Sequence, residues 1–155
     1  MPRYWLMKSE PGSYSIDDLK ADRRTSWEGV RNYQARNFLR DLFQIGDEVL
    51  FYHSNADPPG VVGLARVVRE GYPDPAAHDP KSDYFDARAS EDDPRWYMVD
   101  IEFVEAFETL IPLAAIRDAP SLQNMPLNNR SRLSVQPVTP EQFQIILAMA
   151  RSPRS

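Results

Sequence analysis

The sequence predicts a single α+β domain, in which helices pack outside a small, strongly bent mixed sheet or partly closed barrel. The chain has 155 residues, of which 42% are hydrophobic, and this suits one domain with a substantial core. About five segments have the composition of strands, and helical patterns occur near both ends and between the first two strands. The strands are too short and too varied for the regular crossovers of a doubly wound sheet, so a bent sheet is favoured.

The first strand and the first helix lie within the first 20 residues. Residues 3–8 are rich in aromatic and large apolar side chains, and Pro11-Gly12 ends this strand. Ser15 is suited to cap a short helix, because the acids Asp17 and Asp18 follow at the positive end of the helix dipole.

A second helix is expected after Asn32, whose side-chain oxygen can cap the first turn. The apolar residues of this region fall at helical spacing and predict one buried stripe, made of Phe38, Leu39, Leu42 and Phe43.

Two further strands follow the turn at Gly46-Asp47. Residues 48–53 carry apolar side chains on both faces, which indicates a central strand that is buried on both sides. Residues 61–72 form a longer strand, in which Gly63 indicates a bulge or a close approach of another backbone.

Residues 73–94 contain four prolines and many acids, and they are interpreted as a solvated surface insertion. A strand follows over residues 95–104. Pro112 can open a short helix that extends to Ile116.

The carboxyl-terminal third begins with a loop over residues 119–129 that has a possible turn of helix. Residues 130–138 look extended, and Thr139-Pro140-Glu141 has the pattern of a helix start. The last helix should bury Phe143, Ile146, Leu147 and Ala150. We therefore assign residues 1–150 to one domain, with the acidic loop at about 73–94 inside it, and residues 151–155 to a tail.

Composition limits the possible classes of function. The absence of cysteine excludes disulfides and thiolate metal sites and favours an intracellular protein. No apolar run approaches the roughly 20 residues that span a bilayer, and the amino terminus lacks the pattern of a signal peptide. The net charge of -5 weighs against a general nucleic-acid coat protein.

The charges are distributed unevenly along the chain. Residues 23–40 hold five arginines and one glutamate, whereas residues 70–108 hold twelve acids and three basic residues. Residues 117–155 are again basic, with five arginines and two acids. A basic and an acidic side of one small domain would allow it to dock on a nucleic acid in one orientation.

The stretch from Trp27 to Arg40 begins as an irregular loop and continues as the second helix. Several of its side chains are flat or carry forked donors, namely Trp27, Arg31, Asn32, Tyr33, Arg36 and Asn37. A loop that leads into a helix with such side chains suits a planar polar ligand or an anion. A base attached to a phosphate has both properties. The alternative from composition is a surface helix with an arginine-rich, solvated face.

Polar side chains also occur at the ends of three expected strands. Lys8 and Ser9 end the first strand, and His53, Ser54 and Asn55 end the second. Near the last strand the corresponding residues are Arg132, Ser134 and Gln136. If these strand ends meet at one mouth, their donors and acceptors would surround it, with Trp27 and Tyr33 as stacking faces.

Residues typical of catalysis are scarce. His53 and His78 are the only histidines, and the sequence disfavours a metal site built on one histidine and carboxylates. Ser54 is adjacent to His53 on a strand, so the two side chains point to opposite faces and do not suit a proton relay. No glycine-rich phosphate loop is present. The sequence therefore favours binding over catalysis.

Four segments together resemble the EVE domain family of the PUA-like superfamily. They are residues 4–11 (Tyr4-Trp5-Leu6-Met7-Lys8-Ser9-Glu10-Pro11), 27–37 (from Trp27-Glu28-Gly29 to Asn37), 51–55 (Phe51-Tyr52-His53-Ser54-Asn55) and 133–138 (Leu133-Ser134-Val135-Gln136-Pro137-Val138). The resemblance implies a PUA-like fold, which is a bent pseudo-barrel sheet with flanking helices. It also implies a reader of modified bases, chiefly cytosine modified at ring position five in DNA. Flipping a base out costs a few kcal/mol, which a tight pocket must offset.

The resemblance, together with side-chain chemistry, gives an expected base-binding set. Trp27 and Tyr33 would stack on the base. Ser9, Asn32, Asn37 and Ser54 would bond its polar edge, and Lys8, Arg31 and His53 would meet a phosphate or carbonyl oxygen. Val30, Ser134 and Gln136 complete the set.

The expected partner is nucleic acid that bears a modified base, with DNA favoured over RNA. We expect a monomer in the cytoplasm, or in the nucleus of a eukaryote, with no membrane partner, no cofactor, no metal ion and no catalytic residue. Two alternatives stay open: an RNA-binding module with the same kind of pocket, and a hydrolase or base-processing enzyme that uses His53 with Ser54 or Glu10.

Overall fold

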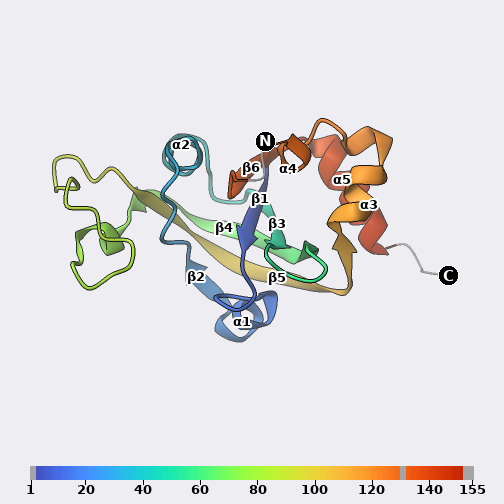
Figure 1. Ribbon diagram of the computed structural model, residues 1–155, viewed down its shortest axis with the longest axis horizontal. Coiled ribbons are helices and arrows are strands. Elements are labelled where there is room, and N and C mark those ends of the chain that lie inside the picture. The colour runs from blue at the N-terminus through green and yellow to red at the C-terminus, as the bar shows by residue number, and fades with distance from the viewer. Residues whose placement is uncertain (1–2, 130–131, 152–155) are drawn as a thin grey trace.

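Six strands form one mixed sheet in the computed structural model, which describes residues 3–129 and 132–151 (Figure 1). The strands are β1 (Tyr4–Ser9), β2 (Arg24–Ser26), β3 (Glu48–His53), β4 (Gly60–Pro73), β5 (Tyr97–Pro112) and β6 (Val135–Val138). They lie in the order β2-β5-β4-β3-β1-β6. The α+β class and the bent mixed sheet predicted from the sequence are confirmed.

The helices connect and flank these strands. The α-helices are α1 (Ile16–Asp22), α2 (Tyr33–Asp41), α3 (Leu113–Asp118), α4 (Pro126–Asn129) and α5 (Pro140–Arg151). Two short 3-10 helices are η1 (Pro75–His78) and η2 (Pro120–Leu122). None of the helices in the described part of the chain is long and apolar enough to cross a membrane.

The chain order explains the one parallel pair of the sheet. β1 and β3 run parallel, because α1, β2 and α2 carry the chain back between them, while the other neighbouring strands are antiparallel. The long strands β4 and β5 cross the whole molecule with several register shifts between them, and such irregularities bend a sheet. The sequence analysis missed β2, which has only three residues and pairs with β5.

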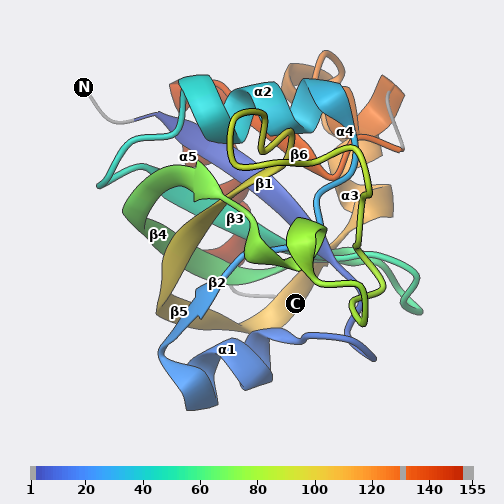
Figure 2. The same cartoon turned by 90° about the vertical axis from the view of Figure 1, so that its left-hand side faces the viewer.

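Each face of the sheet covers its own hydrophobic core. Trp5 and Met7 of β1 join the core that contains residues of α1 and α2, whereas Leu6 joins the core that contains residues of α3 and α5. This alternation follows from the two-residue period of a strand. In Figure 2, α2 lies at the top of the view and α1 at the bottom, and Figure 1 shows α3, α4 and α5 toward one end of the molecule. The prediction that residues 48–53 are buried on both faces is confirmed.

The predicted helix caps are present. Ser15 forms a reciprocal capping box with Asp18, and the Asn32 side chain accepts a hydrogen bond from the backbone N–H of Ala35 at 3.0 Å. The buried stripe after Asn32 is correct only in part. Leu39 is fully buried, but Leu42 is 36% exposed because α2 ends at Asp41, and the helical spacing does not continue past that residue.

Gly63 has the close contact that the sequence predicted. A Cβ at this position would lie 2.4 Å from the backbone oxygen of Glu105. The register of β4 against β5 shifts beside it, between Val61 and Gly63. Glycine is therefore required here because the neighbouring strand occupies the space of a side chain.

The insertion between β4 and β5 lies at the surface, as predicted for residues 73–94, and most of its residues after Ala77 are exposed, but its start is buried and ordered, which corrects that prediction in part. Its ends are joined by a bond from the N–H of Asp74 to the carbonyl of Trp96 at 2.9 Å. Asp74, Ala76 and Ala77 are buried. Its acids also do not lie opposite the basic stretch, because Arg31 pairs with Asp74 at 3.1 Å. Buried backbone groups must find partners, and this accounts for the local order.

A buried carboxylate joins the amino-terminal segment to the turn before β3. Asp47 is completely buried and accepts three hydrogen bonds, from the N–H of Arg3 at 2.9 Å, the indole N–H of Trp5 at 2.9 Å and the N–H of Gln44 at 3.0 Å. The Trp5 ring in turn stacks on Phe43 at 4.2 Å between centroids. These bonds fix the start of β1 beside β3.

We predict that Asp47→Ala lowers the free energy of unfolding by about 2–3 kcal/mol, because it leaves the buried indole N–H of Trp5 and two part-buried backbone N–H groups without an acceptor, at roughly 1 kcal/mol each. Urea unfolding would measure the loss. Asp41→Ala is the matched control, since Asp41 is exposed and its ion-pair partner within the described part of the chain is its neighbour Arg40, and its effect should be much smaller. Equal losses in the two variants would contradict this role of Asp47.

Candidate functional site

A cavity of about 550 Å³ opens where β1 ends, beside the segment that follows β2. Its size falls within the roughly 300–1,000 Å³ of small-molecule sites. Residues from the end of β1, the segment after β2, the insertion and the start of β6 line it, namely Lys8, Ser9, Glu10, Ser13, Tyr14, Thr25, Ser26, Trp27, Glu28, Gly29, Val30, Arg31, Tyr84 and Ser134.

The segment Trp27–Arg31 forms one wall and has no regular structure of its own. Its start is fixed by the sheet, because the N–H of Trp27 bonds the carbonyl of Val99 at 2.8 Å. Its end is fixed by Asp74, whose buried carboxylate accepts from the N–H of Gly29 at 2.9 Å and from Arg31 Nη1 at 3.1 Å. An irregular loop is thereby held in one shape, and its side chains can be placed in advance of any ligand.

Tyr84 of the insertion closes the same wall. Its carbonyl accepts from Arg31 Nε at 3.1 Å and from Arg31 Nη2 at 2.7 Å. Its ring lies so close to Gly29 that a Cβ on that glycine would be 2.6 Å from the ring. Gly29 also has φ +84°, a conformation that favours glycine. Glycine is needed here for two independent reasons.

Trp27 is partly buried and lines the cavity, so its ring is not sealed in the core. Phe51 meets it edge to face, with centroids 5.6 Å apart and planes at 88°. This contact fixes the orientation of the indole. A flat aromatic surface is therefore available at a fixed angle inside the cavity.

The polar side of the cavity comes from the end of β1. The N–H of Lys8 bonds the carbonyl of Ser134 at 2.9 Å, which brings these two strand ends together. Burial lowers the pKa of the Lys8 ammonium, and the ammonium lies 5.8 Å from the centre of the Tyr52 ring. Ser9 donates from Oγ to the carbonyl of Tyr14 at 2.6 Å. Hydroxyl and carboxylate side chains thus share one partly enclosed space, and the Lys8 ammonium lies beside it, over Tyr52.

Half of the expected site residues lie in this cavity. The six that line it are Lys8, Ser9, Trp27, Val30, Arg31 and Ser134. The other six lie outside its lining, namely Asn32, Tyr33, Asn37, His53, Ser54 and Gln136.

The three outer residues on α2 have structural partners instead. Asn32 caps the helix. Tyr33 is 46% exposed and stacks on Trp96, with centroids 4.7 Å apart, and Asn37 accepts from Arg36 Nε at 2.9 Å. The helix turns these side chains away from the cavity that the preceding loop lines, which a linear pattern does not reveal.

The remaining three also serve the fold. His53 Nε2 accepts a hydrogen bond from the backbone N–H of Ile16 at 3.1 Å, at the first residue of α1. The N–H of Ser54 bonds the carbonyl of Ser9 at 2.9 Å. The buried Gln136 donates from Nε2 to the carbonyl of Leu133 at 2.8 Å.

Sequence reasoning missed eight lining residues: Glu10, Ser13, Tyr14, Thr25, Ser26, Glu28, Gly29 and Tyr84. Glu28 and Gly29 directly follow Trp27 in the stretch 27–40, so their position in the sequence already indicated that they could line the site. Tyr84 had no such signal, because it lies in an insertion that was interpreted as solvated. Among residues 3–129 and 132–151, no group of three or more histidine or acidic side chains is arranged to hold a metal ion.

Comparisons with known proteins agree with this fold and with the resemblance. A family model described as EVE domain matches residues 3–149. Human thymocyte nuclear protein 1 is 44% identical over 165 residues, which cover 94% of this chain and 73% of that protein.

Two solved structures are similar over nearly their whole length. A hypothetical protein from Leishmania major has a TM-score of 0.94 and 47% identity, and the match covers 97% of this chain and 96% of that one. Human THYN1 in complex with DNA that contains 5-methylcytosine has a TM-score of 0.91 and 42% identity, covering 98% and 99%.

We predict that Gly29→Ala displaces the Tyr84 ring and costs more stability than Gly46→Ala. Both glycines have positive φ, but nothing lies within 4 Å of a Cβ at Gly46. Gly46→Ala, the control, should therefore lower the free energy of unfolding only by the conformational cost of about 1–2 kcal/mol. Gly29→Ala should lower it further, because the new Cβ displaces the Tyr84 ring. Urea unfolding of both variants, with NMR of the Tyr84 ring protons, measures the difference. Equal costs and an unmoved ring would contradict the contact.

We also predict that the contribution of His53 to stability is lost on acidification. Burial lowers the pKa of His53, and the charge of Asp17 partly opposes this shift. A folded-state pKa below the ordinary value of about 6.5 means that the unfolded chain binds the proton more readily. The contribution is therefore present above about pH 6.5 and falls as the pH drops through the folded-state pKa.

Urea unfolding at several pH values between about 7.5 and 5 would show this as a shrinking advantage of the wild type over His53→Leu. His78→Leu, at an exposed position of η1, is the matched substitution against which the pH trend of His53→Leu is compared. A constant difference between the wild type and His53→Leu across this range would exclude the effect.

Proposed function

Because the chain belongs to the EVE domain family, we propose that it reads a modified nucleobase in nucleic acid and holds the flipped-out base in the cavity beside Trp27. The observation that carries this proposal is a partly enclosed cavity with an oriented indole wall and polar strand ends. The similar human THYN1 is solved with DNA that contains 5-methylcytosine. This relative favours DNA over RNA and a modified cytosine as the base.

Each part of the cavity lining has a role in this proposal. Trp27 offers one face to the base, and aromatic stacking of this kind contributes about 1–3 kcal/mol. Ser9, Ser134 and the neighbouring backbone groups face the polar edge of the base. Lys8 supplies positive charge for a carbonyl oxygen or a phosphate, whereas Arg31, which is paired with Asp74, holds the loop that carries Trp27. Val30 adds apolar surface next to the ring.

The pre-formed loop supports base flipping in energetic terms. Extruding a base costs a few kcal/mol of stacking and pairing, and this cost must be recovered in the pocket. Residues 27–31 are already ordered by Asp74 and Tyr84, so little conformational entropy is lost from them when a ligand binds. A rigid pocket also discriminates between bases that differ by one substituent more sharply than a flexible one.

We propose that the site performs no chemistry. The histidine that an enzyme would need accepts the Ile16 N–H with Nε2, so this nitrogen has a structural partner. Glu10 accepts from Asn55 Nδ2 at 2.6 Å. Both candidate bases of the hydrolase alternative are thus engaged in holding the fold. A reader of this kind would act as a single copy wherever nucleic acid is present, in the cytoplasm or in a nucleus.

The test is a comparison of matched oligonucleotides. We expect a duplex with one 5-methylcytosine to bind more tightly than its unmodified counterpart in fluorescence anisotropy at fixed salt. Trp27→Ala should weaken binding of the modified duplex by about 5- to 100-fold, which corresponds to the loss of one stacked base. Trp27→Phe should give an intermediate loss, because it keeps a smaller aromatic face.

Tyr33→Ala is the matched control, since Tyr33 is an exposed aromatic residue that lies outside the cavity. It should keep the preference for the modified duplex. Urea unfolding confirms that each variant is folded before binding is measured. Equal binding of the two duplexes by the wild type, over a range of salt, would overturn the proposal, and a preference for modified RNA would redirect it to the RNA alternative.

A further inference from the structure

We propose that Arg132 and Arg117 form a phosphate-binding row that carries the nucleic-acid strand away from the cavity along the ends of β6, β1 and β3. This inference rests on the proposed function, because it assumes that a base enters the cavity beside Lys8. It adds the path of the backbone on either side of that base. The partner is the phosphodiester backbone, which is recognised by charge and not by sequence.

The first argument concerns the ion pairs that arginine side chains form with carboxylates. Within residues 3–129 and 132–151, six arginines form ion pairs with carboxylates, namely Arg24, Arg31, Arg40, Arg88, Arg95 and Arg151. Arg117 and Arg132 are both exposed, and no carboxylate of the described residues pairs with either of them. No carboxylate in the described part of the chain pairs with Arg3, Arg23, Arg36, Arg66 or Arg69 either, so the choice of Arg117 and Arg132 depends on their position. In a chain of net charge -5, uncompensated guanidinium groups are the natural contacts for phosphates.

The second argument is their position relative to the cavity. Arg132 lies two residues before Ser134, which lines the cavity and accepts from the N–H of Lys8. On the other side of Lys8, the paired residue of β3 is Tyr52. Ile116, the neighbour of Arg117 in α3, belongs to the same hydrophobic core as Tyr52. Burial raises the pKa of Tyr52, and the positive charge of Arg117 acts against this rise. Arg132 therefore lies on the β6 side of the β1 end, and α3, which carries Arg117, packs on the core that contains Tyr52 of β3.

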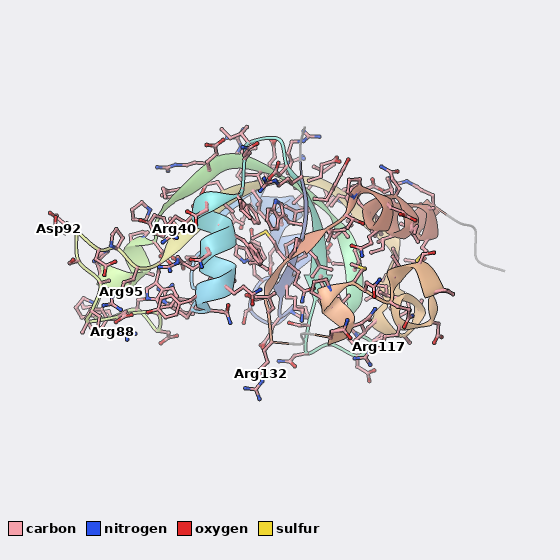
Figure 3. The ribbon with its side chains drawn as sticks, turned by 90° about the horizontal axis from the view of Figure 1, so that it is seen from above. Arg40, Arg88, Asp92, Arg95, Arg117 and Arg132 are labelled. Carbon is pink, nitrogen blue, oxygen red and sulfur yellow. The ribbon has the colours of Figure 1, made fainter. Side chains whose placement is uncertain are left out.

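Figure 3 shows the same arrangement from above. Arg132 projects clear of the ribbon at the lower edge of the view, and Arg117 lies toward the same edge near the helices at the right.

The acidic insertion favours one direction for the nucleic-acid strand as it leaves the cavity. Asp92 marks its tip at the end of the molecule opposite to Arg117 (Figure 3). Its exposed acids, such as Glu91 and Asp83, would repel phosphates at that end. The strand is therefore expected to leave the cavity toward α3 and not across the insertion.

The test measures the salt dependence of binding. Fluorescence anisotropy with the modified duplex and its unmodified counterpart, between about 50 and 200 mM salt, is applied to the full chain, Arg132→Gln, Arg117→Gln and the double variant. Losing one phosphate contact should reduce the slope of log K against log salt by about 0.9. Each single variant should weaken both duplexes several-fold at the lower salt and leave their ratio unchanged.

Arg88→Gln and Arg40→Gln are matched controls, because both side chains are exposed arginines that are neutralised by an acid on the same segment. Their slopes should equal that of the wild type. Slopes of the Arg132 and Arg117 variants that equal those of the controls would overturn the row. A loss of the ratio between the duplexes in these variants would also overturn it, since it would assign them to base recognition.

The outcomes separate this inference from the proposed function. A wild type that binds both duplexes equally, with slopes that fall only in the Arg132 and Arg117 variants, supports the row and overturns modified-base reading. A wild type that prefers the modified duplex, with salt slopes that stay unchanged in the Arg132 and Arg117 variants, supports modified-base reading and overturns the phosphate-binding row.

Discussion

The buried carboxylate of Asp74 is the interaction on which the cavity depends. It lies at the start of the insertion and accepts from the N–H of Gly29, from the N–H of Ala76 and from Arg31. A fully buried carboxylate is costly unless all of its partners are in place. The segment after β2 and the insertion after β4 therefore form one unit, although more than 40 residues separate Arg31 from Asp74 in the chain. Arg31 connects this unit to Tyr84 as well.

The sheet supplies the rest of the geometry. β1 and β3 run parallel, so their carboxyl ends lie at one edge, and Lys8 and His53 lie there on neighbouring strands. The two cores on opposite faces fix these ends rigidly. Functional groups at the ends of well-packed strands are held more precisely than groups on free loops. The cavity lies at this edge, and Arg132 lies two residues before Ser134 of its lining, so the proposed base recognition and the proposed backbone contact would use adjacent surfaces.

Much of the fold could be predicted from local patterns, and the failures have physical causes. The caps at Ser15 and Asn32 depend on residues within three positions, and the structure contains both. The strand β2 was missed, because three residues carry too little pattern and its pairing with β5 depends on distant partners. The insertion was interpreted as solvated, because its composition is polar, yet a few buried contacts suffice to order it. For the site, motif residues such as Trp27 were identified, whereas Tyr84 could not be, since it reaches the cavity only through the folding of the insertion.

The sequence by itself determined the α+β class, the central position of residues 48–53, the helix starts and the segment that forms the cavity wall. These features depend on periodicity and on short-range hydrogen bonds, which adjacent residues encode. Only the tertiary structure decided which polar residues face the cavity and which serve the fold. His53 is the clearest case, because its ring could meet either a ligand or the N–H of Ile16. The choice was made by the packing of α1 against the sheet, a contact between segments that are distant in the chain.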